Sequence, residues 1–138
     1  MGRVFFNTRK DCHSLTGAYT VLSSESGKVF TLNAAAGAAI TLPAVGNAAG
    51  EMGEGWNCRF YTGTLFATSD WVITATDSDM RGVISELATG AANGTVAGTT
   101  ITFELGADSL GDWVELTCDG THIFINGLTT TADAITLA

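Results

Sequence analysis

The stretch SGKVFTLNAAAGAAITLP, residues 26–43, sets two short apolar segments on either side of a run of alanine and glycine. Phe30 and Leu32 fall at alternate positions of the first segment, and Ile40 and Leu42 do so in the second. A period of two is typical of strands buried on one face. The AAAGAA run between them is too short and too interrupted by glycine for a stable helix. We therefore expect a tight connection there, where small side chains permit close approach of the backbone.

Pro43, the only proline of the chain, follows directly and is expected to end the second strand at a sheet edge. The same alternation recurs along the chain, with β-branched and aromatic residues in the alternating positions. Besides the two strands above, candidates are 18–23, 56–61, 71–76, 81–87, 99–105, 112–118, 121–126 and 133–137.

Turn signals separate these segments. Asp119-Gly120 predicts a hairpin of type I′ between 112–118 and 121–126, and Asn126-Gly127 suggests a second tight turn immediately after it. Two glycine-rich segments, 44–55 and 88–98, are expected to be surface loops, either plain connections or contact loops. No long amphipathic helix is evident.

These patterns predict an all-β protein: a compact antiparallel β-sandwich or tulip-like β-barrel with about ten short strands and an extended N-terminal arm. The length of 138 residues suits one domain. We expect the arm to span residues 1–16 and a single β domain to span residues 17–138.

The charge of the chain is sparse and uneven. Only 14% of residues are charged, against about 25% in typical soluble domains, which suggests that a partner covers part of the surface. The net charge is −8, yet three of the six basic residues lie within the first ten positions. An acidic body repels phosphate, so we expect no nucleic-acid partner. No apolar stretch is long enough to cross a bilayer, so we also expect no membrane partner.

Three cysteines, Cys12, Cys58 and Cys118, are widely spaced and odd in number. This pattern fits reduced, mostly buried thiols made in a cytoplasm, as does the missing apolar run of a signal peptide. We expect Cys58 and Cys118 to be unpaired and buried, and Cys12 to be the more accessible thiol.

Two blocks resemble a family. SGKVFTLNAAAGAAITLPA, and after a long middle GDWVELTCDGTHIFING with a short closing AITLA, are similar to the small virion-surface β-modules of tailed bacteriophages, above all head decoration (cement) proteins. The resemblance covers residues 18–45 and 99–138. It implies a homotrimer, bound to the major capsid protein at three-fold positions of the head, that stabilises the shell. It also implies an N-terminal arm lying along neighbouring capsid subunits.

Contact residues follow from these expectations. The capsid-contacting arm is basic and contains phenylalanine; its candidates are Arg3, Val4, Phe5, Phe6, Arg9 and Lys10. The subunit-interface candidates are aromatic residues on predicted strands: Trp113, Phe124 and Trp71. Trp113 alternates with Val114 and Leu116 and so should face outward. Stacking on sugars is the other role open to the three tryptophans, and packing in a core or an interface is the role we favour.

Catalytic and metal-binding chemistry is weakly represented. His13 and His122 are the only histidines, one in the expected arm and one beside a turn, so we expect no enzyme. Adjacent residues of Asp11-Cys12-His13 point in opposite directions on an extended chain and cannot easily close a metal site. Asp77 and Asp79 could supply oxygen ligands to Ca²⁺, although a polar turn is the interpretation we favour. We therefore expect no cofactor and no metal.

The sequence thus predicts a structural virion protein, a capsid decoration protein made in the host cytoplasm and located on the capsid surface. The alternative is a tail-fibre or receptor-binding β-module that recognises host surface glycans through its loops.

Overall fold

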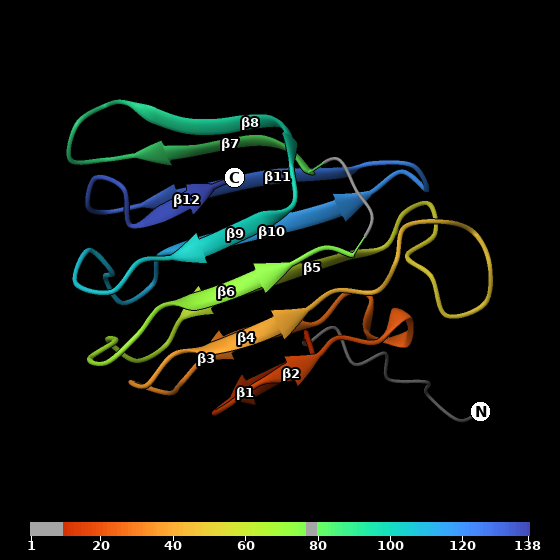
Figure 1. Ribbon diagram of the computed structural model, residues 1–138, viewed down its shortest axis with the longest axis horizontal. Coiled ribbons are helices and arrows are strands. Elements are labelled where there is room, and N and C mark those ends of the chain that lie inside the picture. Colours follow the sequence, from red (N-terminus) through yellow and green to blue (C-terminus); the bar gives the residue numbers. More distant parts are fainter. Residues whose placement is uncertain (1–9, 77–79) are drawn as a thin grey trace, which may run out of the picture.

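The computed structural model describes residues 10–76 and 80–138, apart from the Val96 side chain, and its strands form two packed sheets (Figure 1). The prediction of an all-β protein is confirmed: the only helical element in the described residues is one 3₁₀ turn, Ser23–Glu25. The strands are β1 (Cys12–Leu15), β2 (Tyr19–Thr20), β3 (Val29–Leu32), β4 (Ala38–Thr41), β5 (Asn57–Thr62), β6 (Trp71–Thr74), β7 (Met80–Glu86), β8 (Ala92–Gly98), β9 (Thr100–Phe103), β10 (Trp113–Cys118), β11 (Ile123–Thr129) and β12 (Ile135–Leu137).

The two sheets are mixed, not antiparallel as predicted. One has seven strands in the order β1-β3-β5-β10-β11-β7-β8, and the other has five in the order β12-β9-β6-β4-β2. From β1 to β6 the chain crosses from one sheet to the other after every strand. As a result β1, β3 and β5 are parallel neighbours in one sheet, and β2, β4 and β6 are parallel neighbours in the other. The second half adds antiparallel pairs, including the β10–β11 hairpin. Two separate layers make the architecture a sandwich, not a barrel (Figure 1).

Several local predictions need correction. The segment assigned to the arm contains β1, an edge strand paired with β3, so the arm cannot extend to residue 16. The expected loop 88–98 contains β8, which pairs with β7. Asn126-Gly127 lies inside β11 and makes no turn. Pro43 does follow the end of β4 closely, but β4 is an interior strand between β6 and β2.

The predicted hairpin exists with a different connection. Cys118 pairs with Ile123, so four residues join β10 to β11. The Asp119 carboxylate accepts the backbone N–H groups of Thr121 and His122, at 2.8 and 2.6 Å. Gly120 has φ +88° and Asp119 does not have a positive φ, which excludes a type I′ turn.

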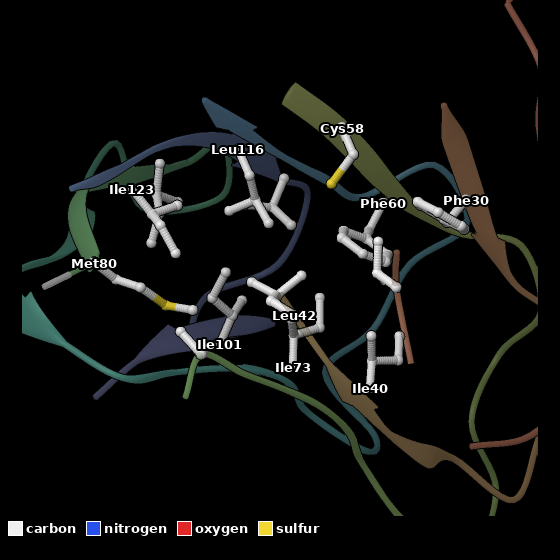
Figure 2. Packing of buried hydrophobic residues seen from close by; sticks show 14 of the residues in the cluster. Phe30, Ile40, Leu42, Cys58, Phe60, Ile73, Met80, Ile101, Leu116 and Ile123 are labelled. Atoms are coloured by element: carbon white, nitrogen blue, oxygen red, sulfur yellow. The ribbon is translucent and has the colours of Figure 1, made fainter. Parts of the chain in front are cut away.

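The core fills the space between the sheets, as Figure 2 shows for part of it. Phe30 of β3 and Phe60 of β5 stack with their ring centres 5.0 Å apart. Ile40, Ile73 and other apolar side chains of the five-stranded sheet oppose them, and all are fully buried. The inward positions are those that alternation predicts for β3, β4, β9, β10 and β11.

The alanine-glycine run carries the chain from one sheet to the other, between β3 and β4. Gly37 within it has φ +65°, and a β-carbon there would lie 2.2 Å from the carbonyl oxygen of Asp70. The prediction of a tight connection with close backbone approach is therefore confirmed.

Within the described residues, no helix combines the length and the apolar character that a membrane crossing requires.

Candidate docking face

The outward side of the seven-stranded sheet brings aromatic and aliphatic side chains of neighbouring strands together in one surface, which we call the outer aromatic face. The strand registers align its members in rows across the sheet, Tyr61 beside Trp113 beside Leu128 in one row and Arg59 beside Glu115 in the next. Its members on the five neighbouring strands β3, β5, β10, β11 and β7 are Val29, Thr31, Asn57, Arg59, Tyr61, Arg81, Val83, Ser85, Trp113, Glu115, Thr117, Phe124, Asn126 and Leu128.

Arg59 organises the middle of this face. Its guanidinium carbon lies 4.7 Å from the centre of the Trp113 ring, within range of a cation–π contact. Nη1 donates to the Tyr61 hydroxyl at 3.0 Å, and Nε donates to the Glu115 carboxylate at 2.9 Å, with Nη2 on the same oxygen. Four side chains of β5 and β10 thereby hold one another in place while remaining accessible on one side.

The electrostatics of the cluster follow from these contacts. Hydrogen bonds to the Tyr61 hydroxyl and the Glu115 carboxylate raise the pKa of Arg59 above its ordinary value, and the guanidinium stays charged at any pH at which the protein folds. The outer aromatic face carries two arginines and one glutamate; Arg59 is paired with Glu115, and Arg81 also has an interaction partner.

The aromatic interface candidates are divided by the structure. Trp113 and Phe124 both lie on the outer aromatic face, with Phe124 47% exposed on the strand next to Trp113. Trp71 is 0% exposed, and its indole N–H donates to the Ala34 carbonyl at 3.0 Å. A side chain sealed within one chain has no surface to offer a subunit, so Trp71 is a core residue and not an interface residue.

Sequence reasoning missed Arg59, Tyr61, Val83 and Leu128. Alternation within the predicted strand 56–61 already places Arg59 and Tyr61 on the side opposite Cys58 and Phe60. The pairing of Arg59 with Glu115, 56 positions apart, depends on a register that no local pattern reveals.

The other outward face differs in character. On the five-stranded sheet one row reads Thr20, Thr41, Thr74 and Thr100 across four neighbouring strands. A second row contains Ala39, Val72, Thr102 and Thr136. We call these two rows the threonine face; it has no aromatic side chain and consists of six threonines, one alanine and one valine.

A shallow depression of about 440 Å³ lies where the 3₁₀ turn meets the loop before β5. The Trp56 indole N–H donates to the Ser23 carbonyl at 3.0 Å and joins the two walls. Its lining is mostly polar: Ser23, Ser24, Ser26, Glu51, Gly53, Glu54, Gly55 and Trp56.

Glu25 is the most strongly partnered buried carboxylate. It accepts the Tyr19 hydroxyl at 2.8 Å, the Lys28 ammonium at 2.9 Å and the backbone N–H of Leu22 at 2.9 Å. Burial alone would raise the pKa of Glu25, but these hydrogen bonds outweigh burial and hold it below its usual value. His13 on the edge strand β1 lies 3.9 Å from the same carboxylate. The cluster ties β1 and β2 to the 3₁₀ turn, which is a structural role.

The remaining buried carboxylates are also held by backbone groups. Asp112 accepts the N–H of Ser109 and of Thr130, and Glu86 accepts the N–H of Asp133. Across residues 10–76 and 80–138, no three His, Cys, Asp or Glu side chains gather as metal ligands would. Asp77 and Asp79, for which a polar turn was favoured above over Ca²⁺ binding, lie outside the described residues.

The arm candidates Arg3, Val4, Phe5, Phe6 and Arg9 also lie outside the described residues, and Lys10 is exposed. Cys58 and Cys118 are unpaired and buried, and Cys12 is exposed, as the sequence predicts. Burial raises the pKa of the Cys58 thiol well above its ordinary value and, less strongly, that of Cys118.

Comparison of the chain with protein-family models, with curated proteins and with solved structures returns no match. What the protein does must therefore be argued from its own residues.

Proposed function

We propose that this chain is a structural, non-enzymatic virion protein that decorates the outer surface of a phage head and stabilises the shell. The observation that carries the proposal is the outer aromatic face, where a hydrogen-bonded and cation–π cluster of Arg59, Trp113 and Tyr61 lies on two interior strands of the seven-stranded sheet. Arginine, tryptophan and tyrosine are the residues most enriched where protein interfaces derive their binding energy.

The rest of the proposal follows from the resemblance of the two sequence blocks to head decoration proteins. The partner is the major capsid protein, and the chain acts as a homotrimer at three-fold positions. The basic segment at the N-terminus adds a second attachment to capsid subunits. The location is the capsid surface, after synthesis in the host cytoplasm.

Electron microscopy of virions labelled for this chain tests the proposal directly. Copies distributed over the head lattice would support decoration. Light scattering on the purified protein tests the oligomer, for which we expect a mass of three chains. A monomer mass at micromolar concentration would count against a stable trimer in solution.

The polar depression favours one second candidate, a receptor-binding module of a tail fibre. Serine hydroxyls and the carboxylates of Glu51 and Glu54 line the depression, and these are groups that hydrogen-bond the hydroxyls of sugars. Label found only at the tail, together with saturation-transfer NMR signals from host surface glycans, would support this candidate over decoration.

A further inference from the structure

We propose that one end of the sandwich, formed by loops 63–70, 87–91 and 104–112, docks on a basic patch of the major capsid protein in the shell. We call this surface the leucine end, because it exposes four leucines: Leu65, Leu87, Leu105 and Leu110. The proposal rests on the proposed function, because the shell is the partner named there. It adds which end of the sandwich faces the shell and what charge the shell carries opposite it.

The three loops lie at the same end of the molecule, at the left of Figure 1. They follow the last residues of β5, β7 and β9, and the third loop leads into Trp113 at the start of β10. Trp113 pairs with Tyr61 on one side and with Leu128 on the other. This row of the outer aromatic face is the last before the loops begin, so the leucine end adjoins that face.

Exposed apolar side chains are concentrated at this end. Seven large apolar side chains are exposed among the described residues, and four of them are these leucines. Leu87 is 65% exposed and Leu110 is 63% exposed, more than any other of the seven. Large apolar side chains gathered on one part of a protein surface commonly mark a contact with another protein.

Hydrogen bonds between the loops hold the leucines in place. The Asp108 carboxylate accepts the backbone N–H of Phe66, the neighbour of Leu65, at 2.8 Å. The Asp70 carboxylate accepts the backbone N–H of Leu105 at 2.7 Å. These two bonds join the loop before β6 to the loop before β10. A surface that is positioned before binding loses less conformational freedom when its partner arrives.

The third loop belongs to the same network through the turn between β11 and β12. The Asp112 carboxylate accepts the backbone N–H of Thr130 at 2.8 Å, and the Thr130 carbonyl accepts that of Ala88 at 3.1 Å. Ala88 is the neighbour of Leu87, and Asp112 comes two residues after Leu110. All four leucines are therefore carried by one hydrogen-bonded set of loops.

Charge at the leucine end has one sign. The loops between strands at this end are 16–18, 33–37, 63–70, 87–91, 104–112 and 130–134, and their sequences contain no lysine, arginine or histidine. Together with the last residue of β7 they contain six carboxylates: Asp70, Glu86, Glu104, Asp108, Asp112 and Asp133. Backbone N–H groups and threonine hydroxyls donate to five of these carboxylates. Such neutral donors leave the negative charge in place.

This charge excludes several occupants. Nucleic acid, anionic lipid and the leucine end of a second copy would each place like charges opposite one another. The opposite end of a second copy offers no basic patch either. Its described bases are Lys10, Lys28 and Arg81, against the acids Asp11, Glu25, Glu51, Glu54 and Asp119. Lys28 already binds Glu25, and Arg81 also has an interaction partner.

The occupant that remains is a different protein, with apolar pockets beside lysine or arginine side chains. Such a surface would bury the leucines and meet the carboxylates next to them with opposite charge. On a phage head, the protein that lies beneath a decoration protein is the shell subunit. The leucine end and the adjoining row of the outer aromatic face then form one continuous contact with the shell.

Leucine substitutions at the two ends of the sandwich test the proposal. Leu87→Ser and Leu110→Ser change the two most exposed leucines of the leucine end. Leu22→Ser is the matched control, because Leu22 is 56% exposed and precedes the 3₁₀ turn at the opposite end. Binding to shells assembled from the major capsid protein alone is measured by co-sedimentation at low and at high salt.

Charge substitutions test the sign of the partner. Ala67, exposed at the leucine end, is changed to Lys or to Glu. Ala49, exposed in the loop between β4 and β5 at the opposite end, receives the same two changes as a control. Because all these side chains are exposed, the solution mass and the cooperative unfolding of every variant should match those of wild type.

We expect Leu87→Ser and Leu110→Ser each to weaken shell binding about tenfold, because each removes one buried leucine from the contact. Ala67→Lys should weaken binding about three- to tenfold at low salt and Ala67→Glu should strengthen it by a similar factor, with both effects reduced at high salt. The Leu22 and Ala49 variants should stay within about twofold of wild type.

The opposite signs at Ala67 would show an acidic partner surface and overturn the proposal. Equal losses from Leu22→Ser and Leu110→Ser would overturn it as well, because docking would then not distinguish the two ends. Loss of an oligomer on Leu110→Ser would assign the leucine end to contacts between copies. If wild type binds shells and the leucine variants bind equally well, only this proposal fails. If wild type does not bind shells at all, the proposed function fails and this proposal fails with it.

Discussion

Gly127 lies so close to Trp113 on the neighbouring strand that a β-carbon at Gly127 would be 2.6 Å from the Trp113 carbonyl oxygen. The same β-carbon would also lie 2.6 Å from the Ile84 side chain. We expect Gly127→Ala to force β10 and β11 apart and to lower the free energy of unfolding by about 1–3 kcal/mol. Because Trp113 belongs to the outer aromatic face, the same change should weaken shell binding.

Gly17→Ala is the matched control for that change. Nothing lies within 4 Å of a β-carbon at Gly17, and its φ is not in the left-handed region. Alanine there should leave the protein as stable as wild type or stabilise it by about 0.4–1 kcal/mol, because it restricts the unfolded chain. Chemical denaturation measures the free energy of unfolding of both variants. Equal values for Gly127→Ala and Gly17→Ala would contradict the prediction, because they would show that the neighbours of Gly127 accommodate a β-carbon without destabilising the fold.

Glu25 should make stability depend on pH in the acid range. The pKa of Glu25 is lower in the folded protein than in the unfolded chain. Its contribution to the free energy of unfolding is therefore present above the unfolded-state pKa near 4.5, and it is lost as the pH falls through the folded-state pKa. Glu25→Gln removes charge-assisted hydrogen bonds and should destabilise the protein at pH 7 by about 1–3 kcal/mol. The gap between wild type and variant should shrink as the pH falls below 4.5.

Thermal unfolding of wild type and Glu25→Gln between pH 3 and pH 7, an interval spanning ordinary carboxylate pKa values, measures that gap. Glu54→Gln is a suitable control, because the Glu54 side chain is exposed. A gap at Glu25 that stays constant with pH would contradict the assigned hydrogen bonds.

The three thiols should react at very different rates. Cys12 is exposed, whereas Cys58 and Cys118 are buried with pKa values above the ordinary one, so little reactive thiolate is available at neutral pH. A maleimide reagent under native conditions should label Cys12 first, and mass spectrometry of the digested protein identifies the site. Cys12→Ser should then abolish fast labelling. Rapid reaction at Cys58 would show that the sandwich opens readily.

The sequence was most informative where the signal is local. Alternation identified the buried side of β3 and β10, because a period of two depends only on neighbouring residues. It missed β8, whose ANGTVAG sequence lacks regular bulky residues and becomes a strand through its pairing with β7. It also missed β1, which has only four residues and is completed by β3.

The mixed sheets could not be read from the sequence for a related reason. Parallel pairing of β1, β3 and β5 arises because the chain visits the other sheet between them, and strand order is a property of the whole fold. The candidate face shows the same limit. Trp113 and Phe124 were recognised one at a time, whereas the cluster around Arg59 requires the register between β5 and β10.

The last prediction concerns the N-terminal segment and uses the corrected boundary of the fold. Deleting residues 2–9 removes Arg3, Phe5, Phe6 and Arg9 and leaves β1 intact. If this segment is a second attachment to the shell, the shortened protein should keep its thermal stability and its oligomeric mass. Its binding to undecorated shells should weaken, because one of two linked contacts is lost.

A second variant, which lacks residues 2–14, is compared with the variant that lacks residues 2–9. That deletion also removes most of β1, including His13, whose ring lies 4.9 Å from that of Tyr19 and 5.9 Å from that of Phe30. It exposes the edge of β3 and should lower the melting temperature as well as binding. Full shell binding by the protein lacking residues 2–9 would refute an attachment role for the segment. Loss of the oligomer in that same variant would instead assign the segment to contacts between copies.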